Sequence, residues 1–154
     1  EVDMWSLAAM LPELRTGNVC FPAESESDLF ACYCDVLGMP PSSLLERVDP
    51  LITQDLVEVD ATGAQGVYAL KETLRVSPLG NPRSVGARTI AMLARARKTD
   101  ASFVDFLRHS LAWDPQERLT VEAAVDHDWV TKINLHQHRT PGGARRSPAG
   151  DASN

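Results

Sequence analysis

The residues that could bind a metal or attack a substrate are cysteines and histidines. Cys32 and Cys34 stand two positions apart, and further candidate ligands follow at His127, His136 and His138. Residues two apart on a helix face nearly opposite directions. The sequence also has no CxxC and no HxxxH pair of the kind that zinc sites use. Nothing near either thiol supplies a base to activate it, so we expect neither a metal site nor a catalytic cysteine.

Three arginines precede a Ser/Thr-Pro pair, in RVSP at 75–78, HRTP at 138–141 and RRSP at 145–148. A phosphate on such an exposed segment adds a charge that can order a loop or create a docking site. The spacing is typical of proline-directed phosphorylation, and it also arises by chance in proline-rich loops.

The composition is that of one soluble globular domain, with 154 residues, 44% hydrophobic and 23% charged. The net charge is -6; residues 132–154 carry +3, which leaves -9 for residues 1–131. An acidic body does not favour nucleic acid, and the sparse basic segment 132–154 is expected to be a disordered tail. The longest apolar run, IAMLA at 90–94, is too short to cross a membrane.

An odd number of cysteines without a signal peptide indicates a reducing compartment. We therefore expect the protein to be cytoplasmic or nuclear.

Helical spacing recurs at four places, so the fold is expected to be mainly α. Residues 3–15 are apolar almost all round, and Pro12 could kink or shorten this helix. Ser25 and Asp28 have capping-box spacing ahead of the second helix, which Gly38 ends. A third helix is expected within residues 99–113. For the fourth, Thr120 is the expected cap, and Val121, Ala124 and Val125 are expected to face inward.

Residues 41–98 show turn signals and no sustained period, which indicates an irregular insert.

Two segments together resemble a known family. DMWSLAAMLPELRTG at 3–17 and FLRHSLAWDPQERLTVEAAVDHDWV at 106–130 are similar in order and spacing to the C-terminal half of the eukaryotic protein kinase domain. With FPAESESDLFACYCDVLGMPP at 21–41 between them, the chain resembles the dual-specificity tyrosine-regulated kinases of the CMGC group.

The resemblance implies that residues 1–131 are part of the helical large lobe, with the insert of this kinase group at about 41–98. The chain is expected to lack the N-terminal part of the domain. The family commonly has Gly-Cys where this chain has Ala8 and Ala9.

The same resemblance gives roles to four residues. Asp3, Trp5 and Arg118 would support the active site of an intact kinase from within the lobe. For Asp3, a plain helix N-cap is an equal alternative, and for Arg118 the ordinary alternative is a surface arginine. Trp5 is also expected, with Trp113 and Trp129, as a core or half-buried anchor. Glu13 would bind an arginine of the protein substrate, and its ordinary alternative is a solvated charge on the helix.

The groups that carry out phosphoryl transfer in protein kinases do not occur in the sequence: it has no glycine-rich loop, no His-Arg-Asp and no Asp-Phe-Gly. The chain alone is therefore expected to be inactive and to hold no cofactor, while an intact parent kinase would use ATP and Mg²⁺. The alternative is a non-catalytic kinase remnant. In either case a protein substrate or regulator would bind through Glu13, the second helix and the insert.

Overall fold

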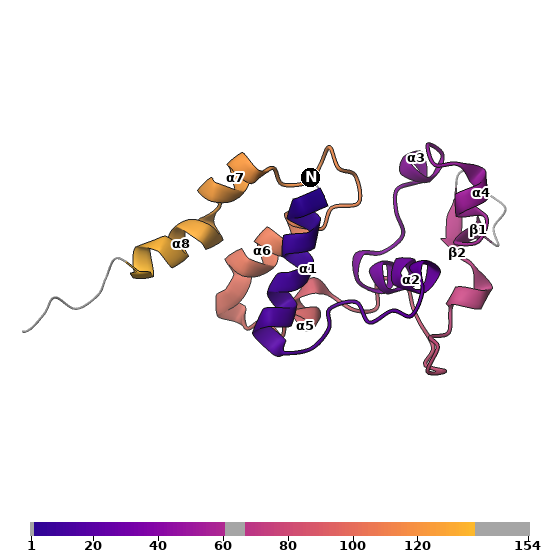
Figure 1. Cartoon of the computed structure of the whole chain (residues 1–154), viewed down its shortest axis with the longest axis horizontal. Helices are drawn as coiled ribbons and strands as arrows, with labels where there is room; N and C mark the ends of the chain where they lie inside the picture. Colours follow the sequence, from indigo (N-terminus) through magenta and orange to yellow (C-terminus); the bar gives the residue numbers. More distant parts are fainter. Residues whose placement is uncertain (1, 61–66, 138–154) are drawn as a thin grey trace, which may run out of the picture.

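The computed structural model describes residues 2–60 and 67–137, and it confirms a mainly helical fold. Figure 1 shows α1 beside α5 and α6, with α7 and α8 at one end of the molecule. At the other end lie α3, α4 and a small hairpin, and α2 lies between the two groups. The helices that form the larger group are α1 (Val2–Thr16), α5 (Ile90–Leu93), α6 (Ala101–Ser110), α7 (Val121–Asp126) and α8 (Asp128–Gln137).

Helix α1 packs on α6 through one face and exposes another. Met4, Ala8 and Pro12 are buried, at the i, i+4, i+8 spacing of one helical face. Pro12 does not end the helix, which continues to Thr16, and the Thr16 hydroxyl donates to the Pro12 carbonyl at 2.7 Å. The opposite face leaves Met10 and Leu14 exposed, so the helix carries apolar side chains on both faces.

The core of the larger group is built mainly from α6. Phe106, Leu107 and Leu111 are almost completely buried, and they belong to one apolar cluster with α1 and α5. Trp129 from α8 packs on Phe103 and Phe106, with ring centroids 4.9 and 4.8 Å apart. Aromatic pairs in this range add stability beyond the area they bury, so this contact helps to hold α8 against α6.

Helix α2 (Glu26–Leu37) begins and ends where the sequence indicates. Ser25 accepts a hydrogen bond from the Asp28 amide at 3.2 Å, and Gly38 adopts the positive φ of 78° that a C-terminal cap needs. The Asp28 side chain does not complete a capping box, because it accepts from the Glu24 amide and pairs with Arg83 instead.

The insert contains short elements that the sequence pattern did not predict: α3 (Ser42–Leu45), α4 (Pro50–Thr53), β1 (Val57–Val59), β2 (Tyr68–Leu70) and the 3₁₀ turn η1 (Glu72–Leu74). The strands pair antiparallel, with Val57 opposite Leu70 and Val59 opposite Tyr68. Leu70 packs on Ala31 and Cys34 of α2 in a second apolar cluster. Strands of three residues are too short to show a period of two, which is why they were missed.

The last two helices differ in part from expectation. Thr120 caps α7 as predicted, accepting from the Ala123 amide at 3.2 Å, but only Ala124 of this helix is buried. The inward positions predicted for Val121 and Val125 are wrong, since both are more than half exposed. Helix α8 continues through Gln137, beyond the predicted start of the tail at Lys132; residues 138–154 lie outside the described part of the chain. No helix in the described residues is long and apolar enough to cross a membrane.

Candidate functional site

The side chains of Trp5 and Arg118 contact each other, although the two residues lie far apart in the sequence. The Arg118 guanidinium stands 4.9 Å from the centre of the Trp5 ring, a distance typical of cation–π contacts. Its Nε and Nη2 donate to the Ala112 carbonyl at 3.2 and 3.0 Å. The guanidinium is half-buried, so Arg118 is not an ordinary surface arginine.

The ring of Trp5 in turn contacts two aromatic side chains. It meets Tyr33 edge-on at 5.1 Å and Trp113 at 5.9 Å, which ties α1 to α2 and to the segment after α6. The anchor role predicted for Trp5, Trp113 and Trp129 fits these contacts, since all three side chains are half-buried.

Asp3 lies in the first turn of α1 and is exposed. A carboxylate there interacts favourably with the helix dipole. Because the helix begins at Val2, Asp3 stands inside the first turn and not at the N-cap position that the sequence suggested.

Glu13 lies near the C-terminal end of α1 and is half-buried. Its Oε1 accepts from the Cys20 amide at 2.8 Å, so the carboxylate fixes the loop that follows the helix. Burial, helped by the charge of Glu13, raises the pKa of Cys20 to about 12. Arg15, two positions further on, pairs with Asp100 at 2.6 Å, just before α6 begins.

A buried cluster of charges joins α2 to the insert, and no local sequence pattern predicted it. Arg83 donates through Nη2 to Asp28 Oδ1, and its Nη1 lies 3.8 Å from Asp35 Oδ2. Nη1 also lies 3.3 Å from Cys32 Sγ, and the Arg83 side chain is only 6% exposed. Burial raises the pKa of Asp35 even though Arg83 and Arg88 favour its ionised form.

The three cysteine thiols lie in the interior of the described structure. Cys20, Cys32 and Cys34 are free and buried, and burial raises the pKa of Cys34 to about 12. A thiol with so high a pKa is a poor nucleophile at neutral pH. Among the described side chains, the structure does not bring Cys32 or Cys34 together with His127; the side chain of His136 and all of His138 lie outside that part.

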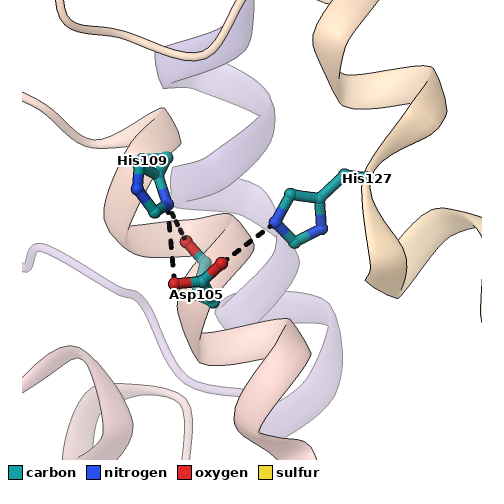
Figure 2. A group of neighbouring side chains, drawn as sticks. All are labelled: Asp105, His109 and His127. Carbon is teal, nitrogen blue, oxygen red and sulfur yellow. Dashed lines mark hydrogen bonds and ion pairs between the residues drawn. The ribbon is translucent and has the colours of Figure 1, made fainter.

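Two histidines meet instead around Asp105, as Figure 2 shows. His127 Nε2 is 3.2 Å from Asp105 Oδ2, and His109 Nδ1 is 3.0 Å from the Asp105 carbonyl oxygen. The Trp129 amide donates to His127 Nδ1 at 3.1 Å, so this nitrogen has no proton and Nε2 must carry it. The His109 Nδ1 likewise carries a proton, because a carbonyl only accepts.

Both rings therefore point N–H groups at Asp105, whereas a metal needs their lone pairs. The three residues form a hydrogen-bonded clamp between α6 and the start of α8. The i, i+4 spacing of Asp105 and His109 could have indicated half of this cluster, but the contribution of His127 comes from the fold.

Comparison with known proteins gives relatives of one kind, although no family model matches the chain. It is 32% identical over 139 residues to dual specificity tyrosine-phosphorylation-regulated kinase 2 of Drosophila melanogaster, which covers 90% of this chain and 18% of that protein. It is 31% identical over 149 residues to human dual specificity tyrosine-phosphorylation-regulated kinase 4, covering 95% of this chain and 26% of that protein. A probable serine/threonine-protein kinase dyrk2 of Dictyostelium discoideum is 31% identical over 133 residues. The chain thus spans about a quarter or less of the length of these relatives.

Proposed function

Since this chain resembles the C-terminal lobe of the dual-specificity tyrosine-regulated kinases of the CMGC group, we propose that it forms part of the large lobe of a protein kinase that phosphorylates proteins. The observation that carries the proposal is the extent of the match. Identity of 30–36% runs through 84–95% of the chain, and it therefore includes the insert and not only the two motifs.

Phosphoryl transfer in such a kinase needs groups that these 154 residues do not supply. Positioning and charge stabilisation by a lysine, a catalytic aspartate and Mg²⁺ account for nearly all of the catalysis. Among the described residues, the side chains that lie close enough together to bind a metal are those of Asp105, His109 and His127. The two imidazole rings direct N–H groups at Asp105, and Mg²⁺ prefers oxygen ligands, so this cluster does not suit Mg²⁺. The residues present thus do not fit a nucleotide–magnesium site, and we assign ATP and Mg²⁺ to other residues of an intact kinase.

Within that kinase, the role of this segment is to support the active site and to contact the substrate. Trp5 and Arg118 support the proposal because they lock α1 to the segment after α6. Asp3 stands exposed at the first turn of α1, where a carboxylate can reach a neighbouring part of the protein.

Glu13 is the proposed contact for an arginine of the protein substrate. Its Oε1 is held by the Cys20 amide, so the position of the carboxylate is fixed before a substrate arrives, and a fixed carboxylate loses less entropy on binding a guanidinium. A protein regulator would dock on α2 and the insert, in the cytoplasm or nucleus.

The test is phosphate transfer to a peptide, measured in parallel for the 154-residue chain and for a protein that joins it to a kinase segment bearing the glycine-rich loop, His-Arg-Asp and Asp-Phe-Gly. We expect transfer only from the joined protein. Transfer by the purified chain alone would refute the assignment of the chemistry to other residues. An inactive but correctly folded joined protein would favour the second candidate, a non-catalytic kinase remnant that binds a protein partner.

A further inference from the structure

A hollow of about 510 Å³ opens between the C-terminal end of α2, the start of α5 and the end of α6. Its floor is apolar and consists of the buried side chains of Val36, Ile90 and Leu111. Trp113 forms one wall, held in place by a hydrogen bond from its Nε1 to the Gly38 carbonyl at 3.2 Å. A volume of this size is in the range of peptide or small-ligand sites.

The charged side chains that line this hollow are Arg88 and Arg108, and both are exposed. We call it the two-arginine hollow. In residues 2–60 and 67–137, neither arginine has a carboxylate within ion-pair distance. The setting is unusual for this protein, because residues 1–131 carry a net charge of -9 while residues 83–98 hold four arginines and a lysine and no acid.

Backbone hydrogen bonds hold the segment that contains Arg88 against α2. Its backbone amide donates to the Asp35 carbonyl at 3.0 Å, next to the Gly86 amide, which donates to the Cys34 carbonyl at 2.9 Å. Arg88 favours the ionised form of Asp35, but this carboxylate is mostly buried and its Oδ2 lies 3.8 Å from Arg83 Nη1. Asp35 therefore does not occupy the guanidinium of Arg88, which stays available on a backbone segment held by α2.

We propose that the two-arginine hollow binds an acidic peptide segment of a partner protein, with one anionic side chain between Arg88 and Arg108. Guanidinium groups bind carboxylates and phosphates in bidentate fashion. An aliphatic or aromatic residue next to the anion would then cover the apolar floor against Trp113. A nucleic acid fits less well, because its many phosphates would meet the acidic body of the chain.

This site does not depend on phosphoryl transfer, and Glu13 does not line it. A chain that is inactive as a kinase can still bind the peptide, and an active parent kinase can fail to bind it. The two proposals therefore stand or fall separately.

The experiment uses the full 154-residue chain, immobilised and exposed to three peptide libraries with a fixed central phosphoserine, glutamate or serine and random neighbours. We expect retention of the phosphoserine and glutamate libraries, enrichment of apolar residues beside the anion, and no retention of the serine library. Stronger retention of the phosphoserine library than of the glutamate library would identify a phosphate as the natural anion. Equal retention of these two libraries would show that the site accepts a carboxylate as well as a phosphate. Equal retention of the serine library would overturn the proposal.

The best peptide is then titrated by fluorescence anisotropy against three variants that each lose one positive charge. Arg88→Gln and Arg108→Gln should each weaken binding about tenfold or more. Lys98→Gln is the matched control, because Lys98 does not line the hollow, and it should change binding less than about twofold. Far-UV circular dichroism checks that the variants fold. Equal losses in all three would show general charge attraction and would refute a defined site.

Discussion

Replacing Arg83 by methionine should destabilise the chain more than any other single loss of an ion pair. Arg83 and Asp28 have side chains 6% and 9% exposed, so the change leaves Asp28 buried without its counter-charge and leaves Asp35 with the charge of Arg88 alone. Breaking a buried pair from one side costs about 3–5 kcal/mol. The Glu24 amide still donates to Asp28 at 2.9 Å, which places the expected cost toward the lower end of that range.

The matched control is Arg75→Met. Arg75 and Glu58 form a direct pair at 2.6 Å, but their side chains are 49% and 40% exposed. Loss of this pair, together with the hydrogen bond from Arg75 Nε to the Leu70 carbonyl at 2.9 Å, should cost about 1–2 kcal/mol. Urea unfolding at neutral pH, followed by tryptophan fluorescence, should therefore separate the free energies of unfolding of the two variants by at least about 1 kcal/mol.

Amide hydrogen exchange locates the effect. The Gly86 and Arg88 amides donate to carbonyls of α2, and in Arg83→Met they should lose protection before the amides of α6 do, because the segment is no longer held on α2. Adding Asp28→Asn should recover part of the loss by removing one uncompensated charge. If Arg83→Met costs no more than Arg75→Met, the buried pair does not hold the insert and this reasoning is wrong.

Three further predictions concern other groups. In an active parent kinase, Glu13→Gln keeps an oxygen that can accept from the Cys20 amide but removes the negative charge. The value of kcat/KM should therefore fall roughly tenfold or more for peptides with an upstream arginine and hardly change for arginine-free peptides. Equal losses for both kinds of peptide would assign Glu13 to the fold alone. The pKa of Asp35 is raised from 3.8 in the folded chain, so this group stabilises the folded state at low pH, and the stabilisation is lost as the pH rises through the raised pKa. Asp35→Asn should remove this pH dependence from the urea midpoint. An unchanged dependence of the urea midpoint on pH would contradict the prediction. His127→Ala should lower exchange protection at the Trp129 amide by about 1 kcal/mol, while His127→Asn, a good capping residue, should restore most of it; equal protection in both variants would show that the ring does not cap α8.

Local signals predicted the helices well, because their causes are local. The apolar run of α1, the Ser25 cap of α2 and the Thr120 cap of α7 act within one or two turns. The inward positions of Val121 and Val125 failed because a six-residue helix that buries only Ala124 leaves its other apolar side chains in water. Periodicity reports which residues could share a face, and it does not report whether anything covers that face.

Most of the pairings that sequence reasoning missed depend on distant partners. Arg83 reaches Asp28 across 55 positions and His127 reaches Asp105 across 22, and no local pattern marks either pairing. Arg88 and Arg108 share one hollow only because α5 and the end of α6 both pack near the end of α2. Asp3, Trp5, Arg118 and Glu13 were singled out through the family resemblance, and their roles stay predictions.

The contact between Asp28 and Arg83 also determines how freely the chain between them can change in length. It closes a loop that leaves α2 after Gly38 and returns to the same helix after the hairpin, so both ends of the loop are held by α2 itself. The entropy of closing a flexible loop grows only with the logarithm of its length, about 0.6 kcal/mol for each doubling. Segments can thus be added to or removed from the chain between Asp28 and Arg83 at little thermodynamic cost, while the surfaces of α2 and α6 keep their geometry. The insert is therefore the part of this lobe where new sequence can be acquired without refolding the rest.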